Sequence, residues 1–350
     1  MNTNFNIKAL IRPNVVALQP YSSARDEFKD FDQEMIFLDA NENPFKNGVN
    51  RYPDPQQRSV KSVLATQKGV ETAQILVGNG SDEVLDLLFR AFCEPNSDNV
   101  ITLPPTYGMY KVLAGINAVE NREVLLTNTF ELNVAEILKQ QDKNSKLLFI
   151  CSPNNPTGNV FNVAAVSELL ENFNGLVVLD EAYIDFSESS SWHTKLSAYP
   201  NLVVTQTLSK AYGMAGIRLG ICYASPEIIA TLTKIKPPYN VNQLTQQKAL
   251  KRLSDISNIK KEIDSIKDER HKLSKALLEV DFIEKIYPSE ANFILVSVDD
   301  AKKRYKQLLE NGIVIRNRSS QPLCENTLRL TVGTPEENNI LIRVLKKLNS

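Results

Sequence analysis

The chain has 350 residues, 42% apolar and 23% charged, which is the composition of a globular protein and excludes a disordered or fibrous one. Its 40 basic residues nearly balance its 41 acidic residues, so the formal net charge is only -1. Such a chain has no global field that would hold nucleic acid or an anionic membrane, and we expect neither as a partner. Any anion that it binds must be held locally. The length predicts one large domain or two coupled ones.

The N-terminus and the cysteines predict a cytoplasmic protein. The opening MNTNFNIKALIRPN lacks the apolar core of a secretory signal, and no stretch approaches the roughly 20 apolar residues that span a bilayer. The four cysteines are far apart in the chain and form no C-x-x-C pair, which predicts reduced, mostly buried thiols: Cys93, Cys151, Cys222 and Cys324. His193 and His271 lie in polar stretches, so we expect two surface residues and no metal centre.

In chain order, the first segment is an arm. Residues 1–25 include RPNVVALQPYSSAR, which has no clear periodicity, so we expect this arm to lie on another part of the protein. We assign residues 46–250 to a large domain. Residues 26–45 and 251–350 are assigned to a smaller domain.

From about residue 57 onward, helical and strand patterns alternate. Helix-like segments such as SDEVLDLLFRAFC are followed by short runs that are apolar throughout, at 99–103, 146–151, 176–179, 201–205 and 219–224. Runs of this kind predict strands buried on both faces of a sheet. The fold class is therefore α/β, with a mainly parallel central sheet flanked by helices.

The pattern changes after KPPYNVN (236–242), whose two prolines interrupt any helix. Apolar residues then recur at helical spacing through a highly charged segment, which predicts one long amphipathic helix: Ile259, Ile263, Ile266, Leu273 and Leu277. Three short strands follow, in NFILVSV, GIVIR and TLRLTVG, with a helix after the first and another at the C-terminus. The tail therefore predicts a smaller α+β domain.

Polar motifs follow three of these apolar runs and a further run, ILV at 75–77. SPNNPTG follows the strand ending near residue 151, DEAY follows 179, LSK follows 207 and GNGSDE follows 77. Ligands of open α/β sheets bind beyond the carboxyl ends of the strands, so these motifs should meet at one edge.

The first motif in the chain, GNGSDE (78–83), predicts a seat for phosphate. Gly80, Ser81 and Asp82 open a helix, and free amides at the positive end of a helix dipole bind anions. It is not a dinucleotide fingerprint, which would place glycine where Glu83 stands. The alternative is a tight turn with a helix cap.

DEAY and NNPTG contribute a carboxylate, a phenol and an amide. Asp180 follows four apolar residues, and a buried carboxylate needs a cation or hydrogen bonds. A protonated ring nitrogen would serve, whereas the simpler alternative is a helix cap. Asn155 and Tyr183 add an amide and a phenol at neighbouring strand ends, although NPTG is also good turn chemistry.

Lys210 lies in TQTLSKAYGMAGIRLG, among Ser209, two glycines and Arg218. Ser209 and Arg218 suit a phosphate, although Arg218 as a surface arginine is the alternative. Desolvation and a nearby arginine would lower the pKa of Lys210 and free its amine for nucleophilic attack. An amine, a phosphate seat, a carboxylate and a phenol together match pyridoxal 5'-phosphate.

At these residues the chain resembles the class I/II aminotransferases of fold type I, over nearly its whole length. A closer resemblance is to the histidinol-phosphate aminotransferases. It rests on PYSSAR, LDANENPF, NRYPDPQ, AFCEP, PPTYGMY, CSPNNPTG, DEAYIDF and LRLTVGT.

The resemblance implies a role for each motif residue. Lys210 would condense with the cofactor's aldehyde and then move a proton between the substrate's Cα and the cofactor's C4' carbon. Asp180 would hold the ring nitrogen protonated. Other cofactor contacts would come from Gly80, Ser81, Asp82, Tyr107, Asn155, Tyr183, Ser209 and Arg218, with Tyr107 stacked on the ring. Tyr52 would reach the phosphate from a neighbouring subunit, which implies a homodimer.

The resemblance also implies a substrate site in the smaller domain. Arg329 and Arg316 would bind the carboxylates of glutamate or 2-oxoglutarate and the phosphate of histidinol phosphate, with Tyr21 assisting. Arg318 is a rival for the role of Arg316, and a solvated strand-end charge is the alternative for Arg316. An arginine fork can address two oxygens of either anion.

The expected activity is reversible amino transfer between histidinol phosphate and 2-oxoglutarate, which gives imidazole acetol phosphate and glutamate in histidine biosynthesis. An aromatic amino acid transaminase or a threonine-phosphate decarboxylase on the same scaffold stays open, because substrate choice depends on a few side chains. A pyridoxal-phosphate-binding regulatory domain is a weaker alternative, since only about 40 residues precede the first motifs, without a helix-turn-helix pattern. A dehydrogenase is weaker still.

Overall fold

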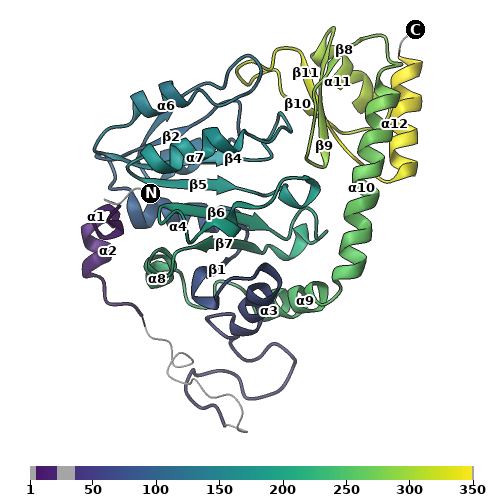
Figure 1. Ribbon diagram of the computed structural model, residues 1–350. Helices are drawn as coiled ribbons and strands as arrows, with labels where there is room; N and C mark the ends of the chain where they lie inside the picture. The colour runs from purple at the N-terminus through teal and green to yellow at the C-terminus, as the bar shows by residue number, and fades with distance from the viewer. Residues whose placement is uncertain (1–4, 22–35, 349–350) are drawn as a thin grey trace.

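The structure is a computed structural model, and it describes residues 5–21 and 36–348. Two sheets organise it: a seven-stranded sheet at the centre and a four-stranded sheet toward the C-terminus (Figure 1). No helix in the described part of the chain combines the length and the apolar character needed to cross a bilayer.

The large sheet confirms the predicted mainly parallel α/β architecture. Its order is β1-β7-β6-β5-β4-β2-β3. The strands are β1 (Ile75–Gly78), β2 (Asn99–Thr102), β3 (Glu120–Glu123), β4 (Ser145–Cys151), β5 (Leu176–Asp180), β6 (Leu202–Thr207) and β7 (Gly220–Ala224). Strands β3, β2, β4, β5 and β6 pair in parallel, and only β7 runs against its neighbours β6 and β1.

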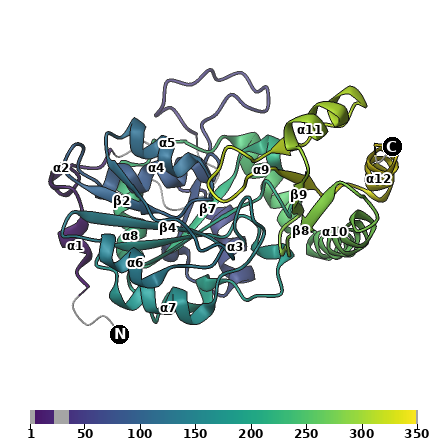
Figure 2. The same ribbon diagram turned by 90° about the horizontal axis from the view of Figure 1, so that it is seen from above.

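Helices cover both faces of this sheet (Figure 2). On one face lie α3 (Arg58–Lys68), α6 (Val134–Gln140) and α7 (Val163–Asn172); on the other lie α4 (Ser81–Phe92), α5 (Met109–Ile116) and α8 (Pro226–Ile235). Because successive side chains of a strand point to opposite faces, Leu148 of β4 packs in the first cluster and Phe149 in the second. Both faces must be covered, which is why the inner strands of this sheet carry continuous apolar runs.

The smaller sheet is antiparallel, in the order β10-β11-β9-β8. Its strands are β8 (Ile283–Ile286), β9 (Phe293–Val298), β10 (Arg316–Asn317) and β11 (Thr327–Thr331); its helices are α11 (Ala301–Glu310) and α12 (Pro335–Lys347). The predicted long helix is confirmed as α10 (Ile256–Leu277), which follows α9 (Gln243–Leu253) and runs up to this sheet (Figure 1). Its buried residues Ile259, Leu273 and Leu277 follow the predicted stripe.

The described part of the predicted arm, residues 5–21, contains two short helices, α1 (Ile7–Leu10) and α2 (Pro13–Ala17). It is fixed to the end of α4, where the side chain of Arg12 pairs with Glu94 at 3.1 Å and its backbone amide bonds the carbonyl of Ala91 at 3.0 Å. The periodicity of these two helices escaped detection because each is only about one turn long.

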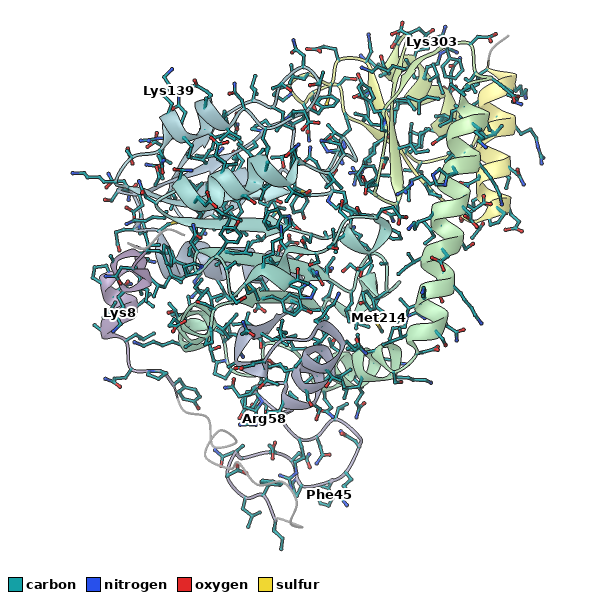
Figure 3. All side chains as sticks on the ribbon, viewed as in Figure 1. Lys8, Phe45, Arg58, Lys139, Met214 and Lys303 are labelled. Atoms are coloured by element: carbon teal, nitrogen blue, oxygen red, sulfur yellow. The ribbon has the colours of Figure 1, made fainter. Side chains whose placement is uncertain are left out.

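The domain boundaries stay a prediction. Of the segment 26–45 that we assigned to the small domain, residues 26–35 lie outside the described residues. The remainder belongs to an extended stretch that projects beyond α3, and Phe45, 80% exposed, points away from the body of the molecule (Figure 3). Residues 40–42 border the same hollow as Asn242, just before α9 begins.

Two sequence predictions were wrong. His193 is buried, since its ring lies between the hydroxyl of Ser191 at 2.6 Å and the carbonyl of Lys68 at 3.1 Å. Because its neighbours in the sequence are polar, the sequence did not indicate that His193 is buried. The strand predicted in GIVIR is only Arg316–Asn317, because Gly312 turns the chain at a φ of +77° and leaves Val314 exposed.

Candidate active site

The carboxyl ends of four strands of the large sheet lie at one edge. Asp180, the last residue of β5, pairs with Cys151 at the end of β4 and with Thr205 of β6. Thr207, the last residue of β6, lies beside Gly220 of β7, and Gly220 pairs in turn with Gly78 at the end of β1. The polar segments that follow β1, β4, β5 and β6 therefore converge, as the alternation of elements predicted.

These segments enclose a cavity with about 500 Å³ of empty space, including its open mouth. It is lined by Ser81, Asp82, Tyr107, Cys151, Asn155, Asp180, Ala182, Tyr183, Thr207, Ser209, Lys210 and Arg218. Most of the residues that we predicted as cofactor contacts are thus neighbours in space although they are spread over more than 130 positions of the chain. The cavity is the candidate active site.

Asp180 forms the floor of the cavity and is 3% exposed. Its Oδ2 accepts a hydrogen bond of 2.7 Å from the hydroxyl of Tyr110, and its Oδ1 accepts one of 3.2 Å from the amide of Ala182. Burial raises the pKa of Asp180, and these hydrogen bonds offset part of the rise. No cationic side chain of the described residues pairs with this carboxylate, so a cation bound in the cavity would satisfy it.

Lys210 lies three residues beyond β6, with its ammonium 5.7 Å from the ring centre of Tyr183. Lys210 is exposed to solvent, so its desolvation is only partial. Burial is nevertheless the largest cause of a lowered pKa for Lys210, followed by the positive charge of Arg329, while Asp180 acts in the opposite direction. The structure therefore favours the free amine in the sense that the sequence predicted.

Ser209 and Arg218 line one corner of the cavity, and Gly80 lies beside Arg218. Gly80 has a φ of +84°, and a Cβ added to it would lie 2.6 Å from Nη2 of Arg218. The hydroxyl of Ser209 accepts a hydrogen bond of 3.0 Å from Thr207. Helix α4 starts at Ser81, so its first amides face this corner with a guanidinium and a hydroxyl, as a phosphate site requires.

The side chains of Asp82 and Tyr107 join this corner. Arg218 lies 3.8 Å from a carboxylate oxygen of Asp82, and the hydroxyl of Tyr107 donates to the other oxygen at 3.1 Å. The ring of Tyr107 meets that of Tyr110 edge to face at 5.6 Å, so its orientation is fixed by two contacts. Its ring borders the cavity, where a planar ligand could stack on it.

Arg329 brings the small sheet to the cavity. Its Nη1 donates a hydrogen bond to Oδ1 of Asn155, and its guanidinium lies 5.1 Å from the ring centre of Phe293. Phe293 in turn meets Tyr183 edge to face at 5.1 Å. Burial, followed by the charge of Arg318, lowers the pKa of Arg329 to about 10. A desolvated cation thus stands beside Asn155 and Tyr183.

Arg316 lies directly across the ladder from Arg329, but its side chain is exposed. Arg318 is more enclosed, and burial followed by the charge of Arg316 lowers its pKa. The three arginines of this ladder are therefore neighbours.

Tyr52 and Tyr21 do not line the cavity of their own chain. Tyr52 stacks on Tyr239 with ring centres 4.4 Å apart and borders a separate hollow. Tyr21 is 73% exposed at another hollow, beside α8. Their predicted roles stay predictions.

Three residues that line the cavity escaped the sequence analysis: Cys151, Ala182 and Thr207. Tyr110, which bonds Asp180 from behind the cavity wall, escaped it too. A signal for Tyr110 was present, because PPTYGMY carries a second tyrosine three positions after Tyr107. Only the fold shows that this second tyrosine meets Asp180.

The donor set fits pyridoxal phosphate on observations of this chain alone. The carboxylate of Asp180 is buried without a cationic partner, which suits a protonated ring nitrogen. The space beside Gly80 is one that a Cβ would fill, so backbone and Arg218 can approach a phosphate closely. An amine with a lowered pKa lies at the same cavity.

This fold and site define a class of protein, and comparison with known families agrees with it. The chain belongs to the aminotransferase class I and II family, whose sequence profile matches residues 29–345. It is a pyridoxal-phosphate-dependent aminotransferase.

Individual members of the family share much of the sequence of this chain. The chain is 68% identical over all of its length to a histidinol-phosphate aminotransferase of Flavobacterium johnsoniae, and 64% identical to one of Christiangramia forsetii, with 99% of each chain covered. The solved histidinol-phosphate aminotransferase of Clostridium acetobutylicum has a TM-score of 0.80 at 25% identity, covering 86% of this chain and 91% of its own. That of Sinorhizobium meliloti, solved with pyridoxal 5'-phosphate, has a TM-score of 0.78 at 22% identity, covering 85% and 83%, which shows a shared fold.

Proposed function

We propose that this chain transfers the amino group of histidinol phosphate to 2-oxoglutarate, giving imidazole acetol phosphate and glutamate in histidine biosynthesis. We infer the substrate from relatives that are 64% to 68% identical over essentially the full length and are named histidinol-phosphate aminotransferase. The observation that carries the proposal structurally is Arg329, a partly desolvated cation hydrogen-bonded to Asn155 at the edge of the lysine's cavity. Histidinol phosphate carries a phosphate, and glutamate and 2-oxoglutarate carry carboxylates, so each of these substrates offers an anion that Arg329 could bind.

The residues divide the work between holding the cofactor and moving a proton. Bound pyridoxal phosphate supplies an aldehyde that condenses with amines and a ring that accepts electrons. Asp180 offers its charge to the ring nitrogen, while Ser209, Arg218 and the first amides of α4 bind the phosphate. Tyr183 and Asn155 hydrogen-bond the ring's phenolic oxygen.

Lys210 is then the group that moves the proton. Its Nζ would accept the proton from Cα of the substrate and return it at the C4' carbon of the cofactor. The lowered pKa of Lys210 suits this role, because it favours the neutral amine, which is the form that can accept a proton.

We further propose a cytoplasmic homodimer in which Tyr52 acts in the partner's site. Tyr52 does not line the cavity of its own chain, and it belongs to a projecting stretch that includes Ile36, Leu38 and Phe45, each at least 80% exposed. Exposed apolar residues on an extended segment are typical of an interface. The four cysteines are free and buried, which suits a reducing compartment.

Glutamate formation tests the activity. Purified holoprotein with histidinol phosphate and 2-oxoglutarate should release glutamate, and the Lys210→Ala variant should release none. Phenylalanine and tyrosine as donors test the aromatic transaminase, and release of carbon dioxide from threonine phosphate tests the decarboxylase. Faster transfer from an aromatic amino acid than from histidinol phosphate would refute the proposed substrate.

A further inference from the structure

Three arginines share one side of the β10–β11 ladder. Arg316 pairs directly with Arg329, and the backbone amide of Arg318 continues the ladder with a hydrogen bond of 2.9 Å to the carbonyl of Thr327. Because side chains two residues apart on a strand point to the same face, Arg318 projects on the same side as Arg316 and Arg329. Three guanidinium groups therefore gather beside the cavity.

These charges are not neutralised within the described chain. No Asp or Glu of the described residues forms an ion pair with any of the three. Arg316 lowers the pKa of Arg318, and Arg318 and Arg316 lower that of Arg329. Bringing like charges together in a partly buried place is unfavourable unless an anion joins them. The cluster therefore has a feature expected of an anion site.

Arg318 and Arg329 also carry hydrogen-bonding capacity that the protein leaves unused. The Nε atoms of both are buried and bond no described residue, and the same holds for the hydroxyl of Ser319 beside them. Buried polar groups are normally satisfied, so each such group requires a ligand or a partner to explain it. Arg316, by contrast, is exposed to solvent.

The charge of Arg318 acts on a residue of the candidate active site. Its positive charge lowers the pKa of Tyr183, opposing the larger effect of burial, and the charge of Tyr183 acts in return on Arg318. Tyr183 lines the cavity that holds Lys210. A ligand anchored near Lys210 could therefore extend its anionic end to Arg318 and Arg329 together.

We propose that Arg318 is a specificity-determining residue, which with Arg329 binds a phosphate monoester and favours this dianion over a monoanionic carboxylate. The inference rests on the proposed function, since it assigns a residue to the phosphate end of that substrate. A phosphate monoester carries nearly two negative charges and three acceptor oxygens at neutral pH, whereas a carboxylate carries one charge and two oxygens. The second guanidinium, that of Arg318, is therefore worth more to the phosphate, because both its charge and its extra donors are used.

The test uses the holoenzyme and three variants. Arg318→Gln removes the charge, Arg318→Lys keeps the charge but loses the fork, and Arg343→Gln removes an exposed arginine of α12 as the matched control. In Arg318→Gln we expect kcat/KM for histidinol phosphate to fall roughly 10- to 100-fold, mainly through KM, and the glutamate half-reaction to change less than about threefold. Arg318→Lys should recover part of the loss, and Arg343→Gln should behave as the unmodified chain.

Binding of inorganic phosphate and of acetate to the holoenzyme, measured by calorimetry, separates this inference from the proposed function. In Arg318→Gln the dissociation constant for phosphate should rise about tenfold or more, while that for acetate changes little. If the unmodified chain fails to use histidinol phosphate, the proposed function fails, yet phosphate binding still decides the role of Arg318. The melting temperature of Arg318→Gln should be unchanged or higher, because an unpaired buried charge is removed. Equal losses for phosphate and acetate, or no loss for phosphate, would overturn the inference.

Discussion

The phenol of Tyr110 donates a hydrogen bond of 2.7 Å to Oδ2 of Asp180, and both side chains are buried. This bond is the largest influence that opposes the effect of burial on the pKa of Asp180. The tyrosine therefore favours the ionised form of the carboxylate and orients it at the floor of the cavity.

Tyr110→Phe should weaken the site without unfolding the protein. A hydrogen bond to a charged group contributes roughly 1.5 to 3 kcal/mol, so we expect cofactor affinity and kcat each to fall about tenfold. Titration of the apoprotein with pyridoxal phosphate and steady-state assays measure the two effects. Tyr305→Phe on α11 removes a phenol outside the cavity and serves as the control. Unchanged affinity and kcat in Tyr110→Phe would show that Asp180 does not depend on the phenol.

Gly80→Ala should impair cofactor binding through its contact with Arg218. The new Cβ would lie 2.6 Å from Nη2 of Arg218, at a backbone φ of +84°. Displacing the guanidinium should raise the dissociation constant for the cofactor at least about tenfold, because a charge-assisted bond to its phosphate is lost.

Gly69→Ala is the matched control for this prediction. Gly69 also has a positive φ, +66°, but an added Cβ would meet nothing within 4 Å. It should lower the free energy of unfolding by roughly 1 to 2 kcal/mol and leave cofactor affinity unchanged. If Gly80→Ala and Gly69→Ala bound the cofactor equally well, Gly80 would have no role in binding its phosphate.

The pH dependence of cofactor uptake should report the charge of Arg329. Lys210 reacts as the free amine, so the rate of uptake by the apoprotein should rise with pH and level off above the pKa of Lys210. That pKa is lowered first by burial and next by Arg329. Removal of the guanidinium in Arg329→Gln stabilises the ammonium form, so the midpoint should move to higher pH.

The visible absorbance of the bound cofactor measures this midpoint. Arg343→Gln removes a distant positive charge and should leave it in place. A midpoint that stays constant or moves to lower pH in Arg329→Gln would contradict the electrostatic account of Lys210.

Mixed dimers should reveal whether Tyr52 acts across the interface. Chains with Lys210→Ala and chains with Tyr52→Ala should each be weak alone. If Tyr52 serves the partner's site, a hybrid dimer contains one site with both residues intact and recovers about half of the unmodified activity, since one of its two sites works. Recovery no greater than the average of the two parents would place Tyr52 outside the partner's site.

Much of the fold could be predicted because its signals are local. Strands β4 to β7 each contain a continuous apolar run, and α10 carries a regular stripe, so period and length were enough. Strands β3 and β8 were missed because ENRE is polar throughout and IEKI is half charged, so only their pairing defines them.

The candidate site was predictable to the extent that polar motifs follow strands. Asp180 and Lys210 could be placed at one sheet edge because each follows a run that reads clearly as a strand. The partnership of Tyr110 with Asp180 joins residues 70 positions apart, and no local pattern encodes it. The burial of His193 likewise depends on the carbonyl of Lys68, 125 positions away.

Reduction of the holoprotein with borohydride, followed by peptide mass spectrometry, tests the central claim most directly. The account predicts one pyridoxyl phosphate group per chain, attached to Nζ of Lys210. Attachment to another lysine, or no attachment, would contradict it.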